Sequence, residues 1–124
     1  RCRTLFKDMP HYHFHWLFDP ELSIENHSNK YDLTMSIDVI YHLVEDEIYH
    51  AHLDTLFNMS KSYVIVYASD EDRENHNNAV HVRHRNFTKY IAQNMPEWRL
   101  LKKVDNPLKS VEKSPSDFFI FEKK

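Results

Sequence analysis

Asp38 and His42 are the two residues whose types and spacing most readily suggest chemistry. They lie in the stretch DLTMSIDVIYHLVEDE, residues 32–47, where most neighbours are apolar. A carboxylate buried without a partner costs several kcal/mol, so we expect Asp38 to face a crevice. If the chain turns helical after Asp38, His42 lies one turn later on the same face. Such a pair could orient a substrate or remove its proton. A turn-capping Asp38 beside an ordinary, partly buried His42 explains the same spacing.

The elements that must position this pair follow from hydrophobic periodicity. Residues 31–38 predict a strand covered on both faces, and SYVIVYAS, residues 62–69, is a β-branched strand. Three further strands are predicted over residues 11–18, 97–104 and 116–124.

Helices are predicted to end near residue 7 and to cover residues 45–60 and 87–95, the last with Asn86 as N-cap. The second has an apolar stripe of Ile48, His52, Leu53, Leu56 and Phe57. Strands separated by helices indicate an α/β fold with parallel βαβ units. The last two strands have no helix between them, so one of them is expected to run antiparallel.

The bulk composition limits the class of protein. The chain has 124 residues, is 41% hydrophobic and has a net charge of −3, so it can form one domain with a core. No broad basic field indicates nucleic acid, and no apolar run approaches the roughly 20 residues that span a bilayer. The single cysteine, Cys2, favours a reducing, cytoplasmic location.

Glycine is absent from the sequence, although usage of about 7% would give roughly nine. Any glycine-rich nucleotide loop must therefore lie outside these residues, because such loops depend on the positive φ that glycine reaches without strain. The sequence also begins at Arg1 rather than at methionine. We therefore expect residues 1–124 to be a partial domain of a longer protein.

Several segments together resemble the C-terminal portion of class I S-adenosylmethionine-dependent methyltransferases. In chain order they are YDLTMSIDVIYHLVEDE, LDTLFNMSKSYVIVYAS, HVRHRNFTKYI, PEWRLL and SDFFIFEKK. The resemblance implies a Rossmann-like sheet that is mostly parallel with an antiparallel C-terminal strand. It also implies that the first two strands and the cofactor loop are missing. Family sheets have the strand order three, two, one, four, five, seven, six.

The resemblance further implies transfer of a methyl group from S-adenosylmethionine to an unidentified acceptor, expected to be a small molecule. The fragment alone is expected to be inactive. Ligands of open α/β sheets bind at the carboxyl ends of the strands, where Asp38 ends the fourth family strand. Asp38 and His42 are the expected catalytic residues. Asp19 resembles the acidic residue that accepts a hydrogen bond from the adenine amino group, although an Asp-Pro turn explains it equally well.

The remaining expected site residues divide between cofactor and acceptor. Ser36, Ile37 and Asp38 are expected beside the cofactor, and Tyr41 and His42 beside the acceptor. A loop before a helix carries three further candidates, which could bind a carboxylate or phosphate of the acceptor: Arg83, His84 and Arg85. A solvated basic loop is the alternative.

Two other functions fit the sequence. The first is a non-catalytic methyltransferase-like interaction module. The second is a His-rich metal-binding protein, because alternate strand positions place three imidazoles on one face: His11, His13 and His15. No cysteine or carboxylate cluster completes a metal site, so none is assigned.

The missing strands also bear on assembly. Without them, the strands at residues 11–18 and 31–38 would have unpaired edges, and such edges seek partners. We therefore expect a homo-oligomer, the missing strands themselves, or direct pairing of these two strands.

Overall fold

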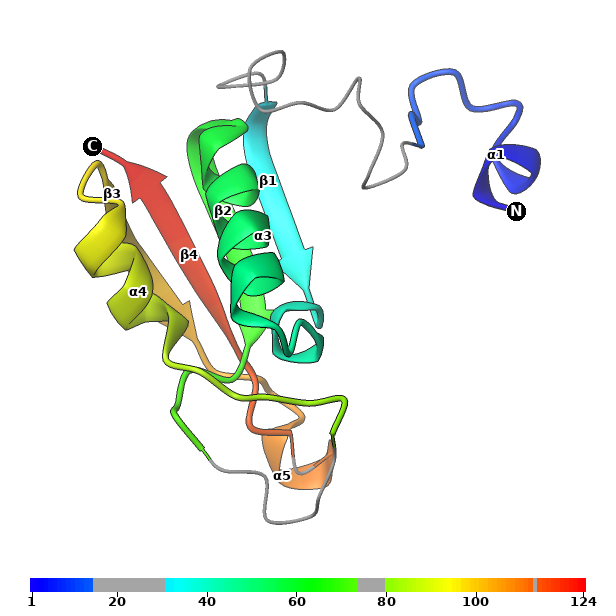
Figure 1. The fold of residues 1–124 in the computed structure, drawn as a ribbon. Coiled ribbons are helices and arrows are strands. Elements are labelled where there is room, and N and C mark those ends of the chain that lie inside the picture. The colour runs from blue at the N-terminus through cyan, green and yellow to red at the C-terminus, as the bar shows by residue number, and fades with distance from the viewer. Residues whose placement is uncertain (15–30, 74–79, 113) are drawn as a thin grey trace.

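The computed structural model describes residues 1–14, 31–73, 80–112 and 114–124 (Figure 1). Its elements in chain order are α1 (Cys2–Leu5), β1 (Tyr31–Ile37), the 3-10 helix η2 (Ile40–His42), α3 (Asp46–Asn58), β2 (Ser60–Ala68), α4 (Phe87–Asn94), β3 (Trp98–Val104), α5 (Lys109–Glu112) and β4 (Asp117–Lys123).

The four strands form one mixed sheet with the order β1-β2-β4-β3. β1 and β2 are parallel and are connected through α3, as the βαβ pattern predicts. β4 is inserted between β2 and β3 and runs antiparallel to both. The α/β class and the single antiparallel strand among the last two are therefore confirmed.

Both longer helices cover the same face of the sheet, and the core lies beneath them. Phe57 of α3 and Phe87 of α4 both contact the ring of Phe121 in β4, at 5.3 and 6.3 Å between ring centroids. Trp98 at the start of β3 contacts Phe57 edge to face at 5.2 Å. Val64 and Val66 of β2 are fully buried in the same cluster. We call this side of the sheet the covered face.

The opposite side of the sheet is not covered by α3 or α4. The register pairs Leu33 with Tyr63 and Met35 with Ile65, which places these four side chains on one side. Leu33, Met35 and Tyr63 are exposed, and so is Ile37, the last residue of β1. We call these residues, together with the half-buried Ile65 and Tyr67, the open apolar face. The expectation that β1 is covered on both faces is therefore wrong, since no described element packs on this side.

The other predictions for the elements are mostly confirmed, with local corrections. Asn86 caps α4 by accepting a hydrogen bond from the Lys89 N–H. The stripe of α3 is confirmed at Leu53, Leu56 and Phe57, but Ile48 is exposed and Tyr49 is buried instead. The polar loop before β4 contains the short helix α5, which the sequence did not indicate.

The predicted strand at residues 11–18 is wrong for residues 11–14, which form a turn and irregular chain. Instead of pairing with a strand, this stretch folds back on α1: Arg3 donates two hydrogen bonds to the Phe14 carbonyl, and Phe6 contacts the rings of Tyr12 and Phe14. Alternation alone does not create a strand, because a strand needs a neighbour to satisfy its backbone. Residues 15–18 lie outside the described residues.

Candidate functional site

Asp38, which follows the carboxyl end of β1, has a backbone conformation that is uncommon for residues other than glycine. Its φ is 62°, and no other residue that the structure describes has a positive φ. This conformation costs an L-residue about 1–2 kcal/mol. It is held by a hydrogen bond of 3.0 Å from the Asp38 N–H to the Tyr67 carbonyl. The turn brings the exposed Asp38 side chain to the end of the sheet, outside the core, and the crevice that it was expected to face stays a prediction.

Tyr41 is the side chain that Asp38 contacts. The Tyr41 hydroxyl donates a hydrogen bond to Oδ1 of Asp38. Partial burial, and then the hydrogen bond to this carboxylate, raise the pKa of the Tyr41 phenol well above its usual value. The phenol therefore stays protonated at neutral pH and remains a hydrogen-bond donor. The buried Ile40 anchors the short helix η2 that carries Tyr41.

His42 does not contact Asp38 in the structure. Its Nδ1 lies 3.3 Å from the carbonyl oxygen of His81, and the two imidazole rings are stacked with centroids 6.3 Å apart. Its ring also lies 4.5 Å from that of Tyr41. The Asp38–His42 pair is thus replaced by an Asp38–Tyr41 pair, because the chain after Asp38 turns as the 3-10 helix η2, in which residues i and i+3 are aligned.

The loop before α4 packs against this cluster. The Arg83 N–H donates to the Tyr41 carbonyl at 2.8 Å, and the His84 ring lies 5.8 Å from the Tyr41 ring. Nδ1 of His84 is hydrogen-bonded to the hydroxyl of Ser69, the residue after β2. Burial and then the charge of Arg73 lower the pKa of His84, so its imidazole is neutral at pH 7.

The guanidinium groups of Arg83 and Arg85 are engaged by α3 and the chain before it. Both lie 3.0 Å from Oδ1 of Asp46, at the start of α3. Arg85 also donates to the carbonyls of Leu43 and Val44 and lies 4.3 Å from the centre of the Tyr49 ring. These contacts fasten the loop before α4 to the start of α3.

The three residues expected beside the cofactor point in different directions. The Ser36 hydroxyl lies on the covered face, 3.0 Å from Nε2 of His52. Burial lowers the pKa of His52, so this contact joins two neutral groups. Ile37 belongs to the open apolar face, and only the side chain of Asp38 reaches the end of the sheet. Asp19 lies outside the described residues.

We call Asp38, Tyr41, His42, Ser69, His81 and His84 the carboxyl-edge cluster. Sequence reasoning missed Ser69. Ser69 follows β2 as Asp38 follows β1, so the rule that ligands meet the carboxyl ends of strands could have identified it. His81 belongs to the basic stretch HVRHR, residues 81–85, that the sequence offers as an anion site, but only the tertiary fold brings it against His42.

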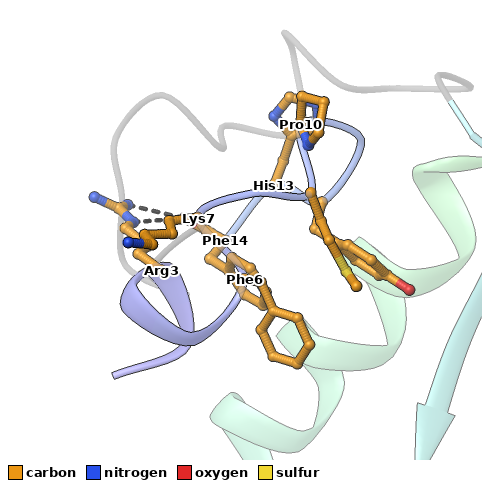
Figure 2. Close-up of a pocket in the computed structure, with 8 residues that line it drawn as sticks. Arg3, Phe6, Lys7, Pro10, His13 and Phe14 are labelled. Carbon is orange, nitrogen blue, oxygen red and sulfur yellow. Dashed lines mark hydrogen bonds between the residues drawn. The ribbon is translucent and has the colours of Figure 1, made fainter.

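Two pockets lie outside this cluster. One, of about 380 Å³, is bounded by the start of α4, where Asp70 accepts hydrogen bonds from the N–H and hydroxyl of Thr88. The same pocket reaches Asp117, which is ion-paired to Lys103 and Lys109. The other pocket, of about 300 Å³, lies within residues 1–14 and is shown in Figure 2. Neither contains a residue expected from sequence to bind cofactor or acceptor.

Comparisons with protein-family models, curated proteins and solved structures found no match to this chain. None of the helices in the described ranges is long and apolar enough to cross a membrane. In those same ranges, no group of three or more histidine, cysteine, aspartate or glutamate side chains could hold a metal ion. His15 of the His11–His13–His15 alternative lies outside them.

Proposed function

We propose that the chain is the C-terminal portion of an S-adenosylmethionine-dependent methyltransferase, with the carboxyl-edge cluster facing cofactor and acceptor. The observation that carries the proposal is the strand order β1-β2-β4-β3 with β4 antiparallel. It equals the order that the family resemblance implies for strands four, five, seven and six. Periodicity along a sequence does not determine spatial order, so this agreement adds to the quoted motifs.

The carboxyl-edge cluster supports the proposal through its unused polar groups. Oδ1 of Asp38 accepts from Tyr41, and Oδ2 has no partner among the described residues. That oxygen can accept a hydrogen bond from a ligand at the end of the sheet. The donors and acceptors of Asp38, Tyr41 and His84 therefore fit a polar, uncharged or cationic ligand better than an anion.

In such a reaction the bound cofactor supplies a methyl group that its sulfonium already makes electrophilic. The residues of this chain orient the acceptor and accept the proton that it loses. Asp38 and Tyr41 form a fixed acceptor and donor pair. His84, whose lowered pKa leaves its imidazole neutral, is the group of this cluster that can accept the proton.

Calorimetric titration of the full-length gene product with S-adenosylhomocysteine tests this function. Asp38→Asn should weaken binding by roughly 1–3 kcal/mol, since it replaces a charged acceptor with a neutral amide. Asp32→Asn is the matched control, because Asp32 lies at the other end of β1 and is exposed. The absence of binding heat with the unmodified protein would refute the methyltransferase function. Equal losses in both variants would refute only the role of Asp38.

A non-catalytic interaction module is the second candidate. The open apolar face favours it, because contiguous exposed apolar surface commonly marks an interaction site. The same titration separates the two, since only the enzyme requires the cofactor product to bind.

A further inference from the structure

The pocket of about 380 Å³ lies between the start of α4 and the stretch that contains β3, α5 and the start of β4. Its volume falls within the range of small-molecule sites, ~300–1,000 Å³. Figure 1 shows α5 beyond the end of the sheet at which β4 begins. Acidic, basic and apolar side chains all line the pocket. None of them belongs to the carboxyl-edge cluster, so the proposed function leaves this pocket unused.

The basic end of the pocket has one ammonium group in excess of its carboxylate. Nζ of Lys103 and Nζ of Lys109 lie 2.9 and 2.7 Å from the same oxygen, Oδ2 of Asp117. The Asp117 side chain is only 4% exposed, so it holds both ammonium groups at a fixed place. Asp105 lies 3.9 Å from Lys103 but is 84% exposed, and such pairs are weak. Each ammonium group has three N–H donors, so both retain donors for a ligand.

The acidic end of the pocket has the opposite imbalance. Asp70 accepts hydrogen bonds from the N–H and the hydroxyl of Thr88, which are both neutral groups. Glu71 also lines the pocket, but it is paired with Arg73 at 3.4 Å. Asp70 has no such cationic partner within 4 Å among the described residues. An ionised carboxylate has about four acceptor sites, so Asp70 can accept further hydrogen bonds.

The two ends are close enough to contact one small molecule. The hydrogen bond to Asp117 raises the pKa of Lys103, and the charge of Asp70 contributes to the rise. Leu100, which is 45% exposed, lines the same pocket. Covering this apolar surface is favourable. The pocket therefore offers a positive end, a negative end and an apolar wall to the same ligand.

We propose that this pocket binds a small zwitterion of the amino-acid type. The carboxylate of the ligand accepts hydrogen bonds from Lys103 and Lys109. Its ammonium group donates to Asp70, and its apolar side chain packs on Leu100. A simple anion would leave Asp70 without a counter-charge, and a simple cation would leave the excess ammonium group without one. A ligand that has both charges complements both ends of the pocket.

Equilibrium dialysis of the full-length gene product with radiolabelled L-leucine tests this proposal, because leucine has both charges and an apolar side chain. Two analogues, measured by competition, separate the charges: isocaproate lacks the ammonium group and isoamylamine lacks the carboxylate. Each should bind at least about tenfold more weakly than L-leucine, since a hydrogen-bonded charge is lost. An absence of saturable L-leucine binding would overturn the proposal. Equal affinity for either analogue would exclude recognition of a zwitterion.

Adjacent lysines of β3 provide a matched pair of variants. Lys103→Met removes an ammonium group from the pocket, whereas Lys102→Met removes one that does not line it. Affinity for L-leucine should fall about tenfold in Lys103→Met and stay unchanged in Lys102→Met. Binding of isoamylamine, which has no carboxylate, should not weaken in Lys103→Met. Equal L-leucine affinities of the two variants would contradict the proposal.

Asp70→Asn makes the reverse test at the other end of the pocket, and it decides the matter if Lys103→Met fails to fold. The amide retains an oxygen that can accept from Thr88. The variant should bind L-leucine about tenfold more weakly and isocaproate, which has no ammonium group, as the unmodified protein does. Unchanged affinity for L-leucine would show that Asp70 does not bind the ammonium group and would overturn the proposal.

Saturating S-adenosylhomocysteine separates this pocket from a cofactor site, because that nucleoside also has an amino-acid end. Its addition should leave L-leucine binding unchanged. Displacement would show that L-leucine occupies the cofactor site, and would overturn the assignment to this pocket. The proposal does not rest on the methyltransferase function. Binding of S-adenosylhomocysteine without binding of L-leucine would refute the zwitterion pocket alone, and the reverse result would refute the proposed function alone.

Discussion

The covered face and the open apolar face are built from alternate residues of the same strands, yet the first is buried and the second is largely exposed to solvent. In β2, Val64 and Val66 are completely buried beneath α3 and α4, whereas Tyr63, which points to the opposite side of the sheet, is exposed. Both sets are apolar, so composition does not distinguish them. The difference lies in which side the connecting helices take. Apolar character in a strand thus indicates that a surface can be covered, without showing that it is.

The largest expected effect tests the covered face. Phe121→Ala should lower the free energy of unfolding by about 3–5 kcal/mol, because Phe121 is buried between the rings of Phe57 and Phe87. Chemical denaturation monitored by circular dichroism measures the change. Tyr63→Ala, on the open apolar face, should change stability by about 0.5 kcal/mol or less if nothing covers it. A cost for Tyr63→Ala similar to that of Phe121→Ala would show that both faces are buried in solution.

The next effect concerns the ion pairs at the start of β4. Burial would raise the pKa of Asp117, but hydrogen bonds from Lys109, the Asn106 N–H and Lys103 outweigh it and lower the pKa to about 2. Asp117→Asn should therefore lower the free energy of unfolding by roughly 1–3 kcal/mol at pH 7, since it leaves these donors with a weaker acceptor.

The pH dependence of that loss has a definite sign. A carboxyl whose pKa is lowered in the folded state stabilises that state fully above its unfolded pKa of 3.8, and this contribution is lost as the pH falls toward 2. The difference between Asp117→Asn and the unmodified protein should shrink over that range. Asp105→Asn is the matched control, because Asp105 is exposed and lies 3.9 Å from Lys103. A difference that does not vary with pH would contradict the ion-pair role.

The smallest effect concerns Asp38, where β1 leaves the sheet between the two faces. Both Asp38→Gly and Asp38→Ala lose the hydrogen bond from Tyr41, so their difference isolates the positive φ. Asp38→Gly should be more stable than Asp38→Ala by about 1 kcal/mol, because glycine adopts φ near 62° without strain. Thermal unfolding of the two variants measures this. Equal stabilities would indicate that the loop relaxes rather than holding this conformation.

Several features of the fold could be predicted because they depend on residues close in sequence. The β-branched run of β2, the cap at Asn86 and the apolar stripe of α3 are local patterns, and the structure has each of them within a few residues. The strand predicted at residues 11–18 failed at residues 11–14 for the opposite reason. Alternation was present there, but pairing requires a distant partner.

Some features of the candidate site could likewise be predicted from the sequence, and others could not. The position of Asp38 outside the core could be predicted, because a carboxylate buried without a partner is costly. Its partner could not, since the choice between His42 and Tyr41 depends on whether the next turn is an α-helix or a 3-10 helix. The engagement of Arg83 and Arg85 with Asp46 joins residues far apart in the chain, and no spacing rule reports such a contact.

The sequence by itself determined the order and type of most elements, because hydrophobic period and caps act over a few residues. It also determined that an acidic side chain, Asp38, lies outside the core next to β1. Residue patterns did not determine that β4 is inserted between β2 and β3, an order that only the family resemblance implied, and only the tertiary structure decided that both helices lie on one face of the sheet. These choices depend on long-range pairing and packing, in which each strand selects a partner from residues far along the chain. For that reason the apolar residues of β1 became an exposed face instead of a second core.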